Sequence, residues 1–407
     1  MEYKLQEVFD IHNSKRIPLS KMERNKQVNK LFPYYGAQGI IDYVEDFLFN
    51  GEYLLVAEDG ENLKTRNENI AQVANGKFWV NNHAHILSVK ENFNTYYLLN
   101  KLNSMDISGY LTGTVQPKLS RRNIEQIRLN LPDKNTQDKI GNFILKLSNK
   151  LQVNQNIIAN LEELSKTLFK RWFVDFEFPD ENGNPYKSSG GEMVDSELGK
   201  IPKGWECVYL KDIVHHKKDT FNPKKSNESE VKHFSLPAFD SGQYPTIDNV
   251  TDIKSNKWII DENCILFSKM NPTTRRIWVT SYNENFLNVA SSEFVVLKSD
   301  NSYRNAFIYN ICISDKFNEY LVSNTTGSTN SRQRVKPDIA VQYRFAYNEE
   351  VSYLLSEKIE PYIEKIKIIR EQNQNLTQLR DTLLPKLMSG EIEIPDDIEV
   401  NEDELSI

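Results

Sequence analysis

The sequence contains little cysteine and no long apolar run. Its 407 residues include three cysteines, Cys207, Cys264 and Cys312, which are odd in number, widely spaced and therefore unsuited to a disulfide framework. No segment approaches the roughly eighteen consecutive apolar residues of a membrane span, and the polar sequence after Met1 is unlike a signal peptide. We therefore expect a cytoplasmic protein with reduced thiols and no membrane partner.

Sequence signatures of catalysis are also missing. A phosphate-binding Gly-x-x-x-x-Gly-Lys loop would need a glycine where Val194 precedes Gly199-Lys200. There is no Gly-x-Gly-x-x-Gly loop, and the nearest echo of a base methyltransferase signature, Asn271-Pro272-Thr273-Thr274, lacks the aromatic ring that would stack on a flipped base. His83 and His85, which we expect on one face of a strand, have no further ligands at metal-binding spacing. We predict a non-catalytic chain that binds no metal and no cofactor itself.

The charge is nearly balanced outside one segment. The formal net charge is −7, which argues mildly against a protein that simply coats nucleic acid. Residues 391–404 hold eight Asp or Glu and no Lys or Arg, so the rest of the chain carries about +1 (−7 + 8). This balance permits DNA binding without demonstrating it.

The dominant pattern is a long heptad-like segment that follows a globular stretch twice. From 137 to 169 apolar residues recur at steps of three and four, which is the seam of a coiled coil. Adding 215 to these positions gives a second seam, with identical pairs such as Ile124/Ile339 and Leu161/Leu376. The predicted seam residues are Ile140, Ile144, Leu147, Leu151, Ile158, Leu161 and Leu168 in the first segment, and Leu355, Ile359, Tyr362, Ile366, Ile369, Leu376 and Leu383 in the second.

Two polar residues interrupt these stripes. Asn154 and Asn373 occupy positions where the seam should be apolar, and a buried Asn commonly fixes the register of a coiled coil. Because one chain supplies both helices at equal length, we predict an intramolecular antiparallel pair. The alternative is that each stripe simply faces an ordinary core.

The expected fold is α+β, with two globular domains separated by a pair of long antiparallel helices in a pseudo-two-fold repeat. Asn135 is expected to cap the first long helix. Around Asn50-Gly51, Phe47–Phe49 and Tyr53–Ala57 predict a strand, a tight turn and a strand. The expected boundaries are 1–131 for the first domain, 132–178 for the central helix, 179–200 for a linker, 201–347 for the second domain, 348–390 for the distal helix and 391–407 for an acidic tail.

Basic residues interleaved with aromatic and amide residues recur in the loops of both globular stretches. Arginine and amide side chains pair with base edges, and lysine contacts phosphates. Any single residue of this kind is more often solvated surface charge, but the repetition before each long helix favours a DNA-binding role. The candidates are Lys15, Arg16, Arg24, Lys26, Tyr34, Tyr35, Lys64, Arg66, Lys118, Arg121, Lys217, Lys218, Lys224, Lys225, Arg275, Arg276, Arg332, Arg334 and Lys336.

Four segments together resemble one known family. They are Gly113–Pro117 with Ile124–Ile127, Leu168–Phe176, Leu198–Trp205 and Leu379–Ile392. In this combination the chain resembles HsdS, the DNA-specificity subunit of type I restriction-modification systems. One departure is that the first domain begins at Leu5 without the Ile-Pro-x-Gly-Trp entry that opens the second.

The resemblance implies a function and a set of partners. Each globular stretch would be a target-recognition domain that reads one half of a split double-stranded DNA sequence with an unspecified spacer. The helix pair would hold the domains apart and dock two methyltransferase (M) subunits, which carry S-adenosylmethionine. Restriction/translocase (R) subunits, which use ATP and Mg, would join for cleavage of foreign DNA in a bacterial or archaeal cytoplasm.

Two other functional classes stay open at this point. The chain could be a rod-like adaptor whose globular stretches bind proteins and not DNA, which salt-dependent, sequence-selective duplex binding would exclude. It could also be a self-contained methyltransferase, although the missing donor-binding loop disfavours that interpretation.

Overall fold

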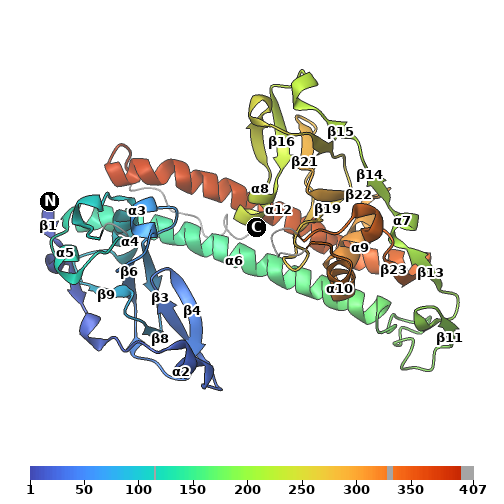
Figure 1. Ribbon diagram of the computed structural model, residues 1–407, viewed down its shortest axis with the longest axis horizontal. Coiled ribbons are helices and arrows are strands. Elements are labelled where there is room, and N and C mark those ends of the chain that lie inside the picture. Colours follow the sequence, from blue (N-terminus) through green and yellow to red (C-terminus); the bar gives the residue numbers. More distant parts are fainter. Residues whose placement is uncertain (114–115, 328–332, 396–407) are drawn as a thin grey trace. The chain divides into compact units, whose positions relative to one another are not determined.

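The computed structural model describes residues 1–113, 116–327 and 333–395, which form two compact units. Unit 1 contains Met1–Lys150 together with the described chain from Gln378, and unit 2 is Leu151–Thr377 (Figure 1). Residues 396–407 of the predicted acidic tail lie outside the described residues. No helix in the described ranges is both long and apolar enough to cross a membrane.

Unit 1 is built on two four-stranded sheets. In the first sheet the central pair, β6 and β9, is antiparallel and contributes the fully buried Leu54, Leu55 and Leu87. The strands of the first sheet, in spatial order, are β2 (Phe9–Ile11), β9 (Ala84–Val89), β6 (Tyr53–Ala57) and β7 (Ala71–Ala74). Those of the second sheet are β4 (Gly39–Val44), β3 (Phe32–Gly36), β8 (Lys77–Val80) and β5 (Phe49–Asn50). The remaining strands, β1 (Glu2–Lys4) and β10 (Arg128–Asn130), pair with each other. Its short helices are α1 (Leu5–Val8), η1 (Asn13–Lys15), α2 (Lys21–Asn25), α3 (Asn62–Thr65), α4 (Thr95–Ser104), η2 (Ser108–Tyr110) and α5 (Arg121–Ile124).

Unit 2 repeats this topology, with β15 as an extra edge strand and an additional two-stranded sheet of β11 and β12. The strand order β14-β22-β19-β20 corresponds to β2-β9-β6-β7 of unit 1. The order β17-β16-β21-β18 corresponds to β4-β3-β8-β5, and β15 is added at its edge. The parallel pairs β3·β8 and β16·β21 also correspond. The strands are β11 (Met193–Ser196), β12 (Gly199–Pro202), β13 (Glu206–Tyr209), β14 (His215–Lys217), β15 (Thr220–Phe221), β16 (Glu230–Phe234), β17 (Thr246–Asn249), β18 (Lys257–Ile259), β19 (Cys264–Ser268), β20 (Ile277–Val279), β21 (Leu287–Ser291), β22 (Phe294–Lys298) and β23 (Arg344–Tyr347).

The helices of unit 2 follow the same plan. Asn94 caps α4 and Asn301 caps α9, each accepting backbone N–H groups of the first turn, which is the ordinary role of Asn at this position. The short helices are α7 (Leu210–Ile213), η3 (Pro223–Lys225), α8 (Leu236–Gly242), η4 (Val250–Asp252), α9 (Ser302–Ile313), α10 (Asp315–Ser323) and α11 (Pro337–Ala340). The two units are therefore two copies of one architecture.

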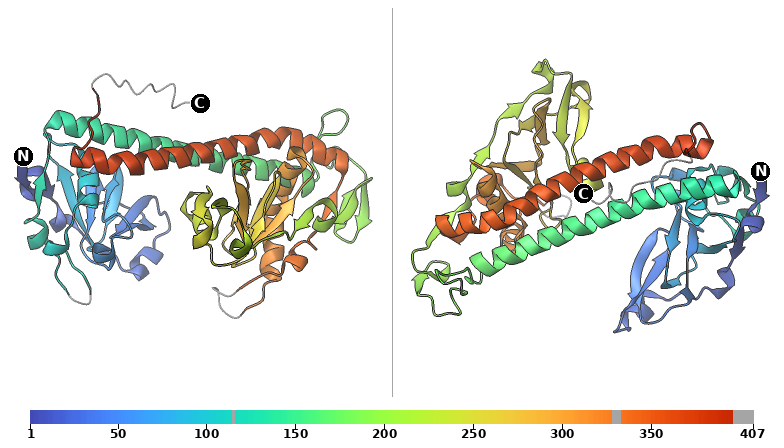
Figure 2. Two further views of the ribbon diagram at one scale, coloured as in Figure 1. Left: turned by 90° about the horizontal axis from the view of Figure 1, so that it is seen from above. Right: turned by 180° about the vertical axis from the view of Figure 1, so that it is seen from behind.

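The two long helices, α6 (Lys134–Phe173) and α12 (Glu349–Ser389), pack together and confirm the predicted antiparallel pair (Figure 2). Within unit 2, Asn154 Nδ2 donates to Asn373 Oδ1 at 2.8 Å, and Arg370 Nη2 donates to Glu162 Oε1 at 2.9 Å. The contact position on α12 falls as that on α6 rises, so the helices run in opposite directions. The two asparagines satisfy each other in a buried seam, which supports their predicted role in register.

The seam serves the unit cores as well as the helix pair. Ile140 and Ile144 join the core of unit 1, where Leu387 of α12 is also buried. Unit 2 attaches to its part of the helices through hydrogen bonds as well, because Tyr309 donates to Glu162 and Ser165 donates to Asn310. The apolar stripe of each long helix therefore faces both the other long helix and the core of a globular unit. Of the predicted seam, Leu147, Leu355, Ile359, Ile366 and Ile369 are also buried, while Leu151, Ile158, Leu161, Leu168, Tyr362, Leu376 and Leu383 are half-buried.

Two local expectations are wrong, and one pair of identical residues is not structurally equivalent. Strand β5 pairs with β8 and not with β6, so Asn50-Gly51 links two sheets and does not close a hairpin. The cap of α6 is Asp133, whose carboxylate accepts the N–H of Thr136 at 3.0 Å, and not Asn135. Ile124 is buried, whereas its sequence match Ile339 is 39% exposed, because the segments before the long helices align at an offset of 216.

Candidate nucleic-acid interface

In unit 1 the segment before α5 is fixed by backbone hydrogen bonds to the chain that leaves β6. The carbonyl of Glu58 accepts the N–H of Leu119 at 2.8 Å. Lys118 exchanges two backbone hydrogen bonds with Thr112, of 2.8 and 2.9 Å, and the Thr112 hydroxyl donates to the Lys118 carbonyl at 3.2 Å. This short ladder holds Lys118 between two chain segments.

Unit 2 contains the same ladder before α11. The carbonyl of Lys269, just after β19, accepts the N–H of Val335 at 2.9 Å. Arg334 exchanges hydrogen bonds of 2.9 and 2.8 Å with Thr326, whose hydroxyl donates to the Arg334 carbonyl at 3.2 Å. Lys118 and Arg334 therefore occupy equivalent positions, and we call them the ladder cations.

The turns that follow β6 and β19 are equivalent as well. Gly60 has a φ of +118° and donates its N–H to the Pro117 carbonyl at 3.2 Å. Asn271 has a φ of +47° and donates its N–H to the Gln333 carbonyl at 2.9 Å. Glycine and asparagine are the residues that accept a positive φ most readily, so unlike sequences build the same turn.

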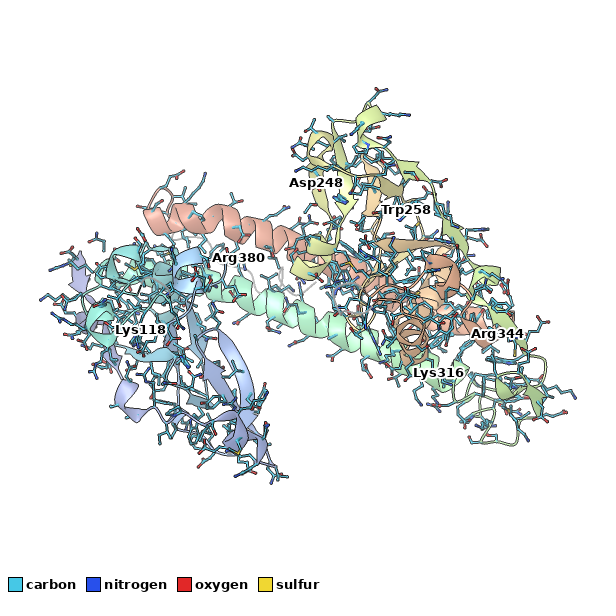
Figure 3. All side chains as sticks on the ribbon, in the orientation of Figure 1. Lys118, Asp248, Trp258, Lys316, Arg344 and Arg380 are labelled. Atoms are coloured by element: carbon cyan, nitrogen blue, oxygen red, sulfur yellow. The ribbon has the colours of Figure 1, made fainter. Side chains whose placement is uncertain are left out.

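Each ladder cation is exposed and faces one carboxylate. Lys118, labelled in Figure 3, lies with its Nζ 3.4 Å from Glu58 Oε1, and its side chain is 51% exposed. Arg334 is 47% exposed, and its Nε and Nη2 lie 3.3 and 3.4 Å from the Glu293 carboxylate oxygens. Sequence reasoning did not identify Glu58 or Glu293 in these roles, because neither carboxylate is near its cation in the chain.

Glu58 also anchors a second predicted residue. Arg16 Nη1 donates to Glu58 Oε2 at 2.6 Å, and to the carbonyls of Asn82 and Ala84. Burial raises the pKa of the Glu58 carboxyl, but the Arg16 hydrogen bond and the charges of His85, Arg16 and Lys118 outweigh this effect and hold the pKa below its ordinary value. The structure thus brings two of the predicted cations, Arg16 and Lys118, together around one carboxylate.

Six other predicted cations are engaged with carboxylates inside their own unit. The pKa of Asp42 falls to about 2, because the backbone N–H of Tyr43 and the side chains of Arg24 and Lys30 donate to it. Such pairs reduce the charge available to a ligand. The pairs are Arg24 with Asp42, Arg121 with Glu125, Lys217 with Asp219 and Asp261, Lys218 with Asp338, Arg275 with Asp315, and Arg276 with Asp240.

Three candidates have structural roles. Tyr34 is 1% exposed, and its hydroxyl bonds the backbone of Leu19, so no ring face is available to a base. Tyr35 packs edge-on against Phe78. Arg66 donates to the carbonyls at the end of α4, which include that of Asn103 at 2.6 Å. Lys15, Lys26, Lys64, Lys224, Lys225 and Lys336 are exposed, and Arg332 lies outside the described residues.

The predicted pair of strand histidines is separated. His83 precedes β9 and bonds Asp59 at 2.9 Å on the surface, whereas His85 is fully buried between Asn13 and the Leu119 carbonyl. Burial lowers the pKa of His85. Among the residues that the structure describes, no group of three or more His, Cys, Asp or Glu side chains is placed to hold a metal ion.

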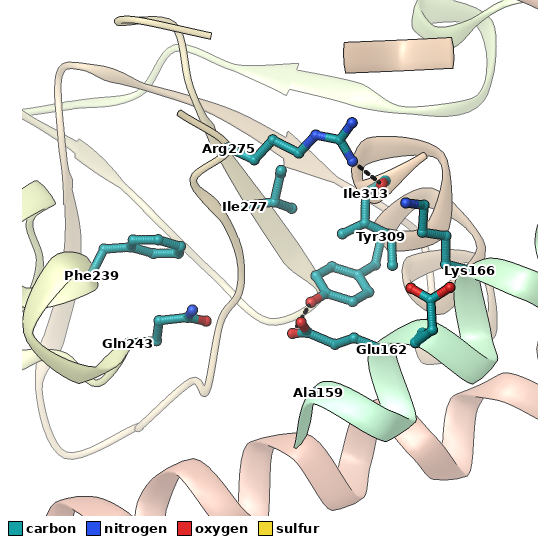
Figure 4. Close-up of a pocket in the computed structure, with 10 residues that line it drawn as sticks. Ala159, Glu162, Lys166, Phe239, Gln243, Arg275, Ile277, Tyr309 and Ile313 are labelled. Atoms are coloured by element: carbon teal, nitrogen blue, oxygen red, sulfur yellow. Dashed lines mark hydrogen bonds between the residues drawn. The ribbon is translucent and has the colours of Figure 1, made fainter. Parts of the chain in front are cut away.

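A cavity of about 290 Å³ lies in unit 2 between α6, α8 and α9 (Figure 4). Lys166 and Arg275 in its wall both contact Asp315, at 2.9 and 2.7 Å, and hold the pKa of that carboxyl below its ordinary value. Tyr309 donates to Glu162 at 2.7 Å. The described lining contains no Ser, Cys or His, so the cavity assigns no nucleophile and base.

Comparison with known proteins relates this architecture to one group. Residues 1–163 match the type I restriction modification DNA specificity domain. A putative type I restriction enzyme specificity subunit of Haemophilus influenzae is 39% identical over 136 residues, which are 33% of this chain and 34% of that relative. The type I restriction enzyme HindI specificity subunit of the same organism is 23% identical over 411 residues and matches across 87% of both chains.

A solved structure shares the whole fold. The crystal structure of a type I restriction-modification S subunit from M. genitalium superposes with a TM-score of 0.62 at 12% identity, and the match covers 95% of each chain. The present chain spans about a third of the first curated relative and most of the second.

Proposed function

Since this chain belongs to the family of type I restriction-modification specificity subunits, we propose that it is the non-catalytic DNA-reading subunit of such a system. Each unit reads one part of a two-part duplex sequence, and the stretch between the two parts is unspecified. The chain acts with other subunits of the system and with DNA.

The observation that carries this proposal is the repetition of one architecture with unlike surfaces. Both units have the same strand order and the same ladder before the last short helix, yet the ladder cation is Lys118 in one and Arg334 in the other. A common scaffold with different exposed groups suits two domains that recognise different DNA sequences. Contacts to bases determine which sequence is bound, whereas contacts to phosphates only position the protein on the duplex.

The partners follow from the same proposal. Two methyltransferase subunits supply S-adenosylmethionine and the methyl-transfer chemistry, and restriction/translocase subunits supply the ATP- and Mg-dependent step. This chain supplies the sequence choice and holds none of these cofactors. The long α6 and α12 helices are the surfaces we assign to methyltransferase docking, which the family resemblance supports.

Selection from a pool of random-sequence duplexes tests the proposal. The chain in complex with its methyltransferase subunit should enrich two short fixed segments at a constant separation. Affinity for the selected duplex should fall steeply with salt, by roughly a thousandfold or more between 50 and 200 mM if six or more phosphates are neutralised. A complex that enriches nothing and whose binding ignores salt would instead be a protein-binding adaptor.

A further inference from the structure

We infer that the ladder cations Lys118 and Arg334 are equivalent DNA-contacting residues of the two units, and that each is held in the free protein by a carboxylate which DNA replaces. Arg334 contacts a base edge in the half-site of unit 2, and Lys118 contacts a phosphate in the half-site of unit 1. This inference rests on the proposed function, and it names the contact residues that the fold alone does not.

The equivalence is set by the backbone and not by sequence alignment. The backbone N–H and carbonyl of each ladder cation both bond one threonine, Thr112 for Lys118 and Thr326 for Arg334. The N–H of the next residue donates to the first carbonyl after the central strand of the sheet. The neighbours after the cations, Leu119 and Val335, are both buried and anchor the ladder. The fold thus places an exposed cation at the same position in both units.

The carboxylates hold these cations weakly. Arg334 lies 3.3–3.4 Å from both oxygens of Glu293, and Lys118 lies 3.4 Å from Glu58. Charge-assisted hydrogen bonds are ordinarily about 2.7–2.9 Å long, so both contacts are longer than a strong ion pair. Because both cations are about half exposed, exchange of these long contacts for contacts with another anion costs little. By contrast, Arg16 donates to Glu58 at 2.6 Å and to three backbone carbonyls, which indicates a structural role.

The two cations differ in what they can read. A guanidinium presents a planar fork that matches the O6 and N7 acceptors of guanine, whereas an ammonium is a point charge suited to phosphate. The carboxylate beside each cation also repels phosphates. Glu293 and Glu58 therefore weaken binding to DNA that offers no compensating contact, which raises discrimination between target and other sequences.

The test uses the full chain in complex with its methyltransferase subunit and a duplex that carries the methylated sequence. Arg334→Gln should weaken binding to that duplex by roughly tenfold or more and relax one base pair in one half only. Compared with Arg334→Gln, the variant Arg334→Lys should regain the salt dependence of the wild type but not its base preference. Lys118→Gln should weaken binding to all sequences alike and reduce the salt slope by about one phosphate contact.

Two matched changes complete the design. Glu293→Gln should tighten binding to non-target duplexes severalfold, because it removes the competing charge. Lys203→Gln removes one cation from an exposed ion pair with Glu192, at 2.8 Å, and should leave binding unchanged. The inference is overturned if Arg334→Gln and Lys118→Gln behave like Lys203→Gln, and its base-reading part is overturned if Arg334→Lys restores full specificity. A wild-type complex with no sequence preference would refute the proposed function itself.

Discussion

Replacing residues 1–131 by the equivalent segment of a relative with a different target should change one half of the methylated sequence and leave the other half intact. The reason is that unit 1 and unit 2 each carry their own pair of sheets and their own ladder cation. Mapping methylated bases in cells that express the hybrid chain gives the outcome directly. A change in both halves would show that the units do not read independently.

The segment that replaces residues 1–131 must pack against side chains of the two long helices that are retained. Ile140, Ile144 and Leu387 of the retained helices are part of the unit 1 core, so the incoming segment must bury them. The relative should therefore be chosen with residues of similar volume facing these three side chains. The reciprocal exchange of residues 201–347 should change the opposite half, which separates loss of folding from loss of independent reading.

Gly141→Ala should destabilise unit 1, although Ala normally favours a helix over Gly. A Cβ at Gly141 would lie 2.0 Å from Asn94 Oδ1 and 2.6 Å from Asn94 Cγ. Asn94 caps α4, so the added methyl displaces the cap, at a cost of about 1 kcal/mol, and overpacks the contact, at about 1–3 kcal/mol. The gain in helix propensity, about 1 kcal/mol, does not offset this. We expect a net loss of about 1–3 kcal/mol in the free energy of unfolding.

Denaturant unfolding of the two variants Gly141→Ala and Gly109→Ala provides the measurement and its control. Gly109 has no heavy atom within 4 Å of its Cβ position and no positive φ, so its replacement should be nearly neutral. The equivalent of Gly141 at the repeat offset is Ser356, which is also small and buried. Equal stabilities of the two variants would show that α4 docks on α6 without the close approach seen here.

The long helices were predictable because their signal is local and repeated. Apolar residues that recur over about eight turns in each segment predicted α6 and α12 to within a few residues. Asn154 and Asn373 marked the interruption of the seam. What the sequence did not show is that these two asparagines pair with each other. Asn154 and Asn373 are not equivalent positions of the repeat, so they lie opposite each other only when the helices are antiparallel and in this register. The packing of the whole chain decides that direction and register.

The candidate site was less predictable, because its decisive partners are distant in the chain. Arg16 and Glu58 are 42 residues apart, and Arg334 and Glu293 are 41 apart. No sequence pattern separates a cation held by such a partner from one that is free. The repeated Thr-Gly at Thr112 and Thr326 was the available signal for the ladders.

The same limit applies to aromatic residues and turns. Tyr34 follows loop-like sequence and precedes a glycine by two residues, yet it is the third residue of strand β3 and is buried. Asn50-Gly51 has the composition of a hairpin turn, but its flanking strands find better partners in different sheets. In both cases tertiary packing overrides local preference.

The most direct measurement of the central claim is a genome-wide map of methylated bases in cells that express the methyltransferase subunit with and without this chain. We predict that the chain adds methylation at one split sequence, with two fixed parts separated by a constant unspecified stretch. Identical maps in both cells, or methylation at a single uninterrupted sequence, would contradict the account of one chain with two reading units.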